Sequence, residues 1–294
     1  MAPGGTFGLS AWRRPKWRRG AGDGHQQVAM GFLARADGQA VDMLDRFGSV
    51  SLEELDRRAS FQRRVDNKYL LSRDLLAAAV QQLARDHDVL EIDGRRSFRY
   101  ESVYFDTPAL ASFHDHVADR APRIKVRSRL YVDSNTSSFE LKLKLADGET
   151  RKEALDQDTR EHGLLTERVR EFLRRCLEEV LDRAAPPDLE PMLVTSFERG
   201  TLVARSGAER VTIDSAVELA RPAGAAVRLV DGLMLVEVKS ENGNEVADAL
   251  LREAGAEPVA ISKYRVGIGL LVAADPEPPL GGKADEVFRP ASEI

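Results

Sequence analysis

Cationic side chains recur at every second position in several segments of this chain, and this spacing has a chemical meaning. In a β-strand, side chains two residues apart lie on the same face. Residues 123–129, RIKVRSR, therefore place four cations on one face, and the apolar residues Ile124 and Val126 on the other. Arginine offers paired N–H donors to phosphate oxygens, and lysine offers a point charge. Such a face is suited to binding a chain of phosphates.

The same division between a charged and an apolar face recurs elsewhere, and Arg199 adds one more cation. The other charged sets are Arg64, Asp66 and Lys68; Glu140, Lys142 and Lys144; Arg210, Thr212 and Asp214; Glu237 and Lys239; Lys263 and Arg265. For any one strand, a polar face exposed to water is the simpler interpretation. Six mostly cationic faces make that interpretation weaker, and in a sheet curled into a barrel they would line a wet, positive interior, because unpaired cations are costly to bury without water or a counter-ion. The pattern of residues alone leaves both orientations of the charged face open. The few carboxylates are candidate ligands for a hard divalent cation.

Strands joined by short turns are expected to carry these faces. Alternation predicts strands over 61–71, 99–105, 123–132, 139–145, 192–204, 210–213, 225–230, 233–239 and 262–268. Tight antiparallel turns are predicted at Asp133-Ser134-Asn135, Asp147-Gly148 and Asp231-Gly232. The sheet is therefore expected to be mainly antiparallel.

Helices are fewer in this interpretation. Ser72 is expected to cap a helix that runs to His87, and Asn244 one that ends before Gly255. Thr166 precedes the clearest helix, whose apolar stripe includes Cys176 as a core residue. The sequence Asp106-Thr107-Pro108 predicts a further helix start. His114 and His116 follow it two residues apart, a helical spacing that points them away from each other, and we interpret them as surface or packing residues.

Composition narrows the class of protein. The 294 residues include 43 Lys and Arg against 48 Asp and Glu, a net charge of −5 that disfavours a nucleic-acid partner. The one cysteine permits no internal disulfide, which fits a reducing compartment such as the cytoplasm. The chain contains no run of 18 apolar residues, so no membrane-spanning helix is predicted. A P-loop enzyme is excluded because the chain has no Gly-x-x-x-x-Gly-Lys-[Ser/Thr] motif.

The ends of the chain differ from its middle. Residues 1–29 are rich in Gly and Arg and show no apolar period, so they are expected to form a disordered tail without a secretory signal. Residues 30–59 are expected to form a helical lead-in. Residues 60–272 form the predicted domain, and 273–294, punctuated by Pro and Gly, a second disordered tail.

Seven short motifs, taken together, resemble the vacuolar transporter chaperone (VTC) domain of the CYTH-like triphosphate tunnel metalloenzymes. They are Arg64-x-Asp66-x-Lys68-Tyr69, Tyr104-Phe105-Asp106-Thr107, Lys125-x-Arg127-x-Arg129, Glu140-x-Lys142-x-Lys144, Arg210-x-Thr212-x-Asp214, Glu237-x-Lys239 and Ser262-Lys263-Tyr264. The resemblance implies an α+β fold, with an antiparallel eight-stranded β-barrel flanked by helices. It also implies ATP-dependent polyphosphate synthesis with Mn²⁺ or Mg²⁺. The wider superfamily has Glu-x-Glu-x-Lys where this chain has Arg64, Asp66 and Lys68, and the arginine favours the VTC branch.

From this resemblance we assign the residues of the expected tunnel. The catalytic candidates are Lys68, Lys239 and Lys263. The phosphate-binding candidates are Lys125, Arg127, Arg129, Lys142, Lys144, Arg199 and Arg210. Glu237 is the first metal candidate and Asp214 a weaker second, while Glu140 is either a ligand or an ion-pair partner. Tyr104 and Tyr264 are interpreted as packing residues.

Several functional alternatives stay open at this point. The expected ligands are ATP and polyphosphate, and the expected reaction is attack of the chain's terminal phosphate on the γ-phosphate of ATP. Water in place of the chain would make the protein a triphosphatase, and a noncatalytic polyphosphate-binding module is the third alternative. Coupling to transport would need a separate membrane-protein partner, since no membrane segment is predicted. The sequence predicts no oligomeric state.

Overall fold

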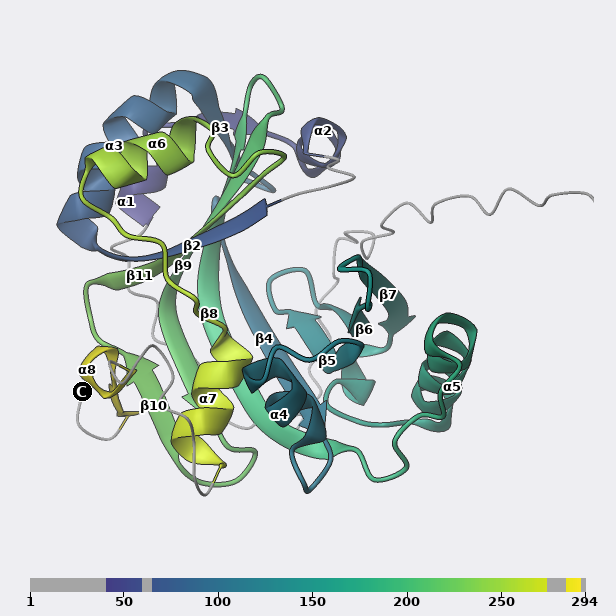
Figure 1. Cartoon of the computed structure of the whole chain (residues 1–294). Helices are drawn as coiled ribbons and strands as arrows, with labels where there is room; N and C mark the ends of the chain where they lie inside the picture. Colours follow the sequence, from purple (N-terminus) through teal and green to yellow (C-terminus); the bar gives the residue numbers. More distant parts are fainter. Residues whose placement is uncertain (1–40, 60–64, 274–283, 292–294) are drawn as a thin grey trace, which may run out of the picture.

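Two long, neighbouring strands form the centre of the sheet, β8 (Glu190–Ala204) and β9 (Glu209–Ala220). The computed structural model describes residues 41–59, 65–273 and 284–291 (Figure 1). The other strands of the main path are β2 (Val65–Ser72), β4 (Ser97–Asp106), β5 (Arg123–Tyr131), β6 (Thr136–Lys144), β7 (Thr150–Gln157) and β11 (Leu233–Ser240).

The strand path runs β2-β11-β9-β8-β4-β5-β6-β7, and every neighbouring pair along it is antiparallel. The prediction of an α+β fold on an antiparallel sheet is therefore confirmed. Within the described residues β7 and β2 form no hydrogen-bonded ladder, so the sheet curls without closing between these two strands.

Four short strands extend this path. β3 (His87–Leu90) pairs with β8 and also, in parallel, with β1 (Gly48–Val50). β10 (Ala226–Leu229) pairs with β9 and with β12 (Phe288–Pro290). The predicted tails over 1–29 and most of 273–294 lie outside the described residues. The remaining part of the second tail was wrongly predicted, because Phe288 is buried and β12 is paired.

The helices lie outside the sheet. They are α1 (Val41–Leu44), α2 (Leu52–Arg58), α3 (Arg73–Asp86), α4 (Ala111–Val117), α5 (Glu167–Leu181), α6 (Val246–Glu253), α7 (Lys263–Leu271) and α8 (Ala284–Val287), with a short 3₁₀ turn over Thr159–Glu161. Figure 1 shows α3 and α6 side by side near β2 and β11, and α5 beyond β7. The predicted caps Ser72 and Thr166 accept hydrogen bonds from Leu75 N and Val169 N. Asn244 is not a cap, since α6 follows Glu245.

Residues 262–268 were predicted as a strand and form the start of helix α7 instead. The apolar residues Tyr264, Val266 and Ile268 alternate with polar ones, but Tyr264 and Ile268 are also four apart, which places them on one helical face. Gly267 allows this helix to lie close to β8, because a Cβ atom there would come within 2.5 Å of the Leu193 side chain.

Two of the three predicted hairpin turns are confirmed, at Asp133-Ser134-Asn135 and at Asp147-Gly148. The third is wrong. β10 and β11 do not pair with each other, because each pairs with a different part of β9. Asp231-Gly232 therefore links two strands that follow one another along the same edge of β9.

Helices cover the apolar face of the sheet. Val236 and Val238 of β11 pack in one cluster with Leu76 of α3 and Leu251 of α6. Leu141 and Leu143 of β6 pack in another with Phe172, Leu177 and Cys176 of α5. Cys176 is thus a core residue, as predicted, and burial raises the pKa of its thiol to about 11. The opposite face of these strands carries the charged residues.

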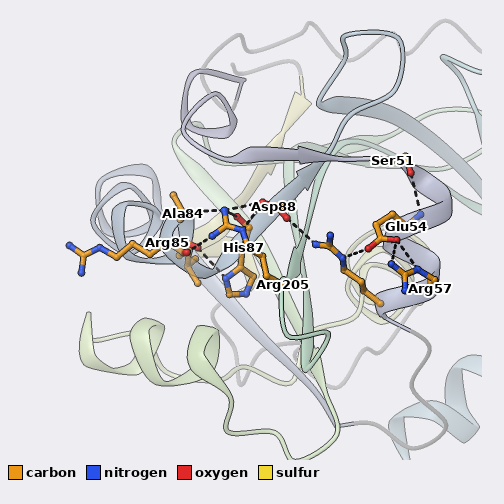
Figure 2. A network of polar contacts seen from close by, with 10 residues as sticks. Ser51, Glu54, Arg57, Ala84, Arg85, His87, Asp88 and Arg205 are labelled. Atoms are coloured by element: carbon orange, nitrogen blue, oxygen red, sulfur yellow. Dashed lines mark hydrogen bonds and ion pairs between the residues drawn. The ribbon is translucent and has the colours of Figure 1, made fainter.

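A separate ion-pair network attaches α2 to this framework (Figure 2). Asp88 of β3 accepts hydrogen bonds from Arg58 at 2.9 Å and from Arg205 at 3.0 Å. Glu54 accepts a hydrogen bond from Arg58 at 2.6 Å, and Ser51 caps the helix. None of the predicted site residues belongs to this network, which we interpret as structural.

Candidate functional site

The strand registers bring the charged faces together. Lys68 lies opposite Glu237, which lies opposite Thr212 on its other side. Arg199 lies opposite Asp214, and Lys125 lies opposite Lys142. We use the term cationic face for the set of predicted lysines and arginines on this side of the sheet: Lys68, Lys125, Arg127, Arg129, Lys142, Lys144, Arg199, Arg210, Lys239 and, from α7, Lys263. Arg64 lies outside the described residues.

Glu237 is a carboxylate of β11 that lies opposite Lys68 of β2. It accepts a hydrogen bond from Lys239 and lies 3.9 Å from the Lys68 ammonium. Burial would raise the pKa of Glu237, but the charges of Lys239 and Lys68 outweigh it and hold that pKa well below its usual value. Burial also lowers the pKa of Lys239 to about 8, although Glu237 partly offsets this. The three charged groups therefore form one coupled unit.

Asp214 is a second carboxylate between cations. Both of its oxygens accept hydrogen bonds from Arg199, at 2.6 and 2.7 Å, and it also accepts one from Lys263. The Arg199 guanidinium lies 5.4 Å from the ring centre of Tyr100 and 4.9 Å from that of Phe197. Aromatic faces attract a guanidinium. Arg199 is therefore fixed from two directions.

Glu140 is the third such carboxylate. Its closest partner is Arg127, whose Nε lies 2.7 Å away, and Arg129 lies 3.8 Å away. Burial would raise the pKa of Glu140, but these two arginines lower it to about 2. Arg127 also donates a hydrogen bond to the Tyr104 hydroxyl at 3.1 Å. The sequence left open whether Glu140 is a metal ligand or an ion-pair partner, and this geometry fits an ion-pair partner.

Lys125 differs from these groups, because its hydrogen-bond contacts among the described residues are with a histidine and a serine and not with a carboxylate. Its ammonium lies 3.4 Å from the Ser262 hydroxyl and 5.3 Å from the ring centre of Tyr264. Burial, and then the charges of Lys142 and Lys68, bring the pKa of Lys125 well below its usual value. Lys68 acts from β2, so the charged face of β2 lies within electrostatic range of β5, although the two strands are not neighbours in the sheet.

The remaining predicted residues lie around these groups. Lys142 is exposed on β6, and Arg210 lies opposite Lys239. Lys144 turns to the carbonyl of Gly148 in its own hairpin, at the end of β6. The structure thus gathers the predicted set on one face, with Lys144 at its margin.

The carboxylates determine which metal site this face could offer. The part of the chain that the structure describes has no group of three His, Cys, Asp or Glu residues that could hold a metal ion. Both oxygens of Asp214 are occupied by cations. Mg²⁺ and ions like it are often bound by one or two carboxylates plus substrate phosphates. Glu237 therefore fits a metal only as the single protein carboxylate beside phosphate oxygens.

The sequence placed Asp106 in a predicted helix start but did not predict that it connects two helices. This buried carboxylate accepts hydrogen bonds from the backbone N–H groups of Thr107, next to it in the chain, and of Ser112 and Phe113 in the first turn of α4. It also accepts one from the Tyr264 hydroxyl of α7. It therefore ties the two helices that border the cationic face to the end of β4. The sequence feature that could have indicated this role is the position of Asp106 at the end of a predicted strand, directly before Thr107-Pro108.

Comparison with known proteins gives one family. The family model of the VTC domain matches residues 63–272. No curated protein matches the sequence. In the described residues, no helix combines the length and apolar character needed to cross a membrane.

Solved structures of three proteins resemble this one. A proposed adenylyl cyclase from Hippeastrum with a dominant triphosphatase activity has 16% identity and a TM-score of 0.47, covering 72% of this chain and 98% of its own. A proposed adenylate cyclase from Bacillus halodurans has 13% identity and a TM-score of 0.41, with the same coverage. A protein from Pyrococcus horikoshii has 13% identity and a TM-score of 0.37, covering 65% and 90%.

Proposed function

Because the chain belongs to the VTC domain family, we propose that its cationic face binds a chain of phosphates and transfers a phosphoryl group. The observation that carries this proposal is the gathering of Lys68, Lys125, Arg127, Arg199 and Lys263 on one side of one curved sheet. Cations held this close repel one another, and a multiply charged anion would relieve that repulsion.

We further propose that the reaction is polyphosphate synthesis from ATP. An oxygen of the chain's terminal phosphate attacks the γ-phosphorus in line, a P–O bond forms, the bond to the β-phosphate oxygen breaks, and ADP leaves. Phosphoryl transfer depends mainly on alignment and on neutralising charge. The cationic face has groups for both tasks.

Individual residues have distinct roles in this scheme. Arg127, Arg129 and Arg199 are suited to hold phosphate oxygens in fixed orientation, since carboxylates or aromatic rings fix each guanidinium. Lys125, Lys142, Lys144 and Arg210 would add charge along the phosphate chain. Lys68, Lys239 and Lys263 are proposed to surround the transferred phosphoryl group.

Mn²⁺ or Mg²⁺ is the proposed cofactor, and Glu237 is its proposed protein ligand. A bound divalent ion would neutralise charge that develops on the phosphate oxygens. Asp214 is assigned the position of an anchor for Arg199 and Lys263, because both of its oxygens already accept hydrogen bonds from them.

Product analysis tests this proposal. Purified protein is incubated with ATP and Mn²⁺, and the products are resolved by size and by nucleotide. Polyphosphate with ADP is the expected result. Orthophosphate with ADP would show that the protein is a triphosphatase and not a polyphosphate synthase. Unchanged ATP together with tight polyphosphate binding would show that it is a noncatalytic binding module. Arg175→Gln, on the exposed face of α5, is the matched control for loss of one positive charge.

A further inference from the structure

His116, in the last turn of α4, contacts Lys125, whose hydrogen-bond partners among the described residues include no carboxylate. Its Nε2 lies 3.4 Å from the Lys125 ammonium, the same distance as the Ser262 hydroxyl. The centre of the Tyr264 ring lies 5.3 Å from the same ammonium. His116 is half-buried, whereas His114 of the same helix is exposed. The two histidines therefore point to different environments, and only one of them reaches the site.

The charges around this pair are positive. Arg123 and Lys142 act on both His116 and Lys125, Arg265 of α7 acts on His116, and Lys68 and Arg127 act on Lys125. Burial first, and then the charges of Lys125, Arg123, Arg265 and Lys142, lower the pKa of His116 to about 3. The imidazole is therefore neutral at physiological pH.

A neutral imidazole has one acceptor nitrogen and one N–H donor. A lysine ammonium has donors only, so Nε2 must be the acceptor toward Lys125, and Nδ1 must carry the proton. Within the described residues, Nδ1 is buried and has no hydrogen-bond partner. Folding alone gains little from an imidazole buried in this way, because an unpartnered N–H is unfavourable. The contact with Lys125 is the interaction that the ring does make.

We propose that His116 is a positioning residue that keeps the Lys125 ammonium protonated and oriented for phosphate. This inference rests on the proposed function. Neighbouring cations favour loss of a proton from Lys125, and a hydrogen-bond acceptor favours its retention. A carboxylate in this place would also accept, but it would cancel the positive charge and repel phosphate. A neutral imidazole orients the ammonium without cancelling its charge.

The first test measures binding of inorganic tripolyphosphate between pH 6 and pH 10 by calorimetry. His116→Ala removes the acceptor, so the pH above which affinity declines should fall by about one unit. His116→Gln should restore the parent profile, because its amide oxygen can accept in place of Nε2. His114→Ala is the matched control and should behave as the parent does. A parental profile for His116→Ala, or a shift to higher pH, would overturn the proposal.

The second test needs no ligand. Nitrogen-15 NMR of the His116 ring in the parent protein should report a neutral imidazole with its proton on Nδ1 from pH 8 down to pH 5. A proton on Nε2, or titration above pH 5, would refute the inferred pair. A parent protein that binds no tripolyphosphate at any pH refutes the proposed function, whereas a parent that binds with unchanged His116→Ala refutes only the role of His116.

Discussion

Asp214 and Arg199 lie opposite each other on β9 and β8, and both carboxylate oxygens accept hydrogen bonds from one guanidinium, at 2.6 and 2.7 Å. Lys263 approaches the same carboxylate from α7. One buried anion thus positions cations from a strand and from a helix. This arrangement explains how Lys263 belongs to the site although it is not on a strand.

The first prediction concerns the stability that Asp214 provides. Asp214→Asn keeps the shape of the side chain but removes the anion from two half-buried cations, Arg199 and Lys263, which should cost about 3–5 kcal/mol of unfolding free energy. Added tripolyphosphate should recover part of this loss, since it supplies negative charge. Urea unfolding with and without tripolyphosphate measures both effects. Asp231→Asn, in an exposed turn, is the control. Equal midpoints for Asp214→Asn and the parent would contradict the anchoring role.

The second prediction concerns the pH dependence of Glu140. Its pKa in the folded protein is about 2, because Arg127 and Arg129 outweigh the effect of burial. A depressed carboxylate pKa stabilises the fold above the unfolded value of about 4.3, and this stabilisation is lost as pH falls toward the folded value. Glu140→Gln should therefore destabilise the protein by about 2–3 kcal/mol at pH 7 and by less at pH 3. A difference that stays constant between the two pH values would be inconsistent with this ion pair.

The third prediction tests Glu237 as the metal ligand. Glu237→Gln removes the charge that a divalent ion requires, so turnover should fall by about a hundredfold and the Mn²⁺ concentration for half-maximal turnover should rise. Titration of Mn²⁺ at fixed ATP measures both. Glu241→Gln, exposed just beyond β11, should behave as the parent does. Parental Mn²⁺ dependence in Glu237→Gln would remove it as a ligand.

The fourth prediction distinguishes the contribution of Tyr264 to the stability of the fold from its contribution to tripolyphosphate binding. Tyr264→Phe removes the hydroxyl that donates to Asp106, which should lower the unfolding free energy by about 1–3 kcal/mol. The ring under Lys125 remains, so affinity for tripolyphosphate should change less than threefold. Urea unfolding and calorimetry on the same preparation give the two values. Loss of affinity without loss of stability would reverse the assignment.

Strand faces were predictable because a period of two residues is directly encoded in the sequence. Lys125, Arg127 and Arg129 required only the assumption of a strand, and β5 places them as expected. β7 was missed because only one of its eight residues is buried, so apolar residues do not alternate clearly along it. The helix that carries Lys263 was misread because its apolar residues satisfy both periods.

Contacts between distant segments were less accessible. The sequence of α4 gave no sign that His116 meets Lys125, since that contact depends on how the helix packs on β5. Asp231-Gly232 has a typical hairpin sequence, but pairing of both flanking strands with β9 decided the topology. The net charge of −5 likewise conceals a local positive face, because it averages over the whole chain.

The central claim is that the cationic face binds phosphate chains, and calorimetric titration with inorganic tripolyphosphate tests it most directly. The parent protein should bind, and affinity should fall as salt rises. Lys125→Gln and Lys142→Gln should each weaken binding by about tenfold, whereas Arg175→Gln on α5 should not. No binding by the parent, or equal affinity in all four proteins, would contradict the account.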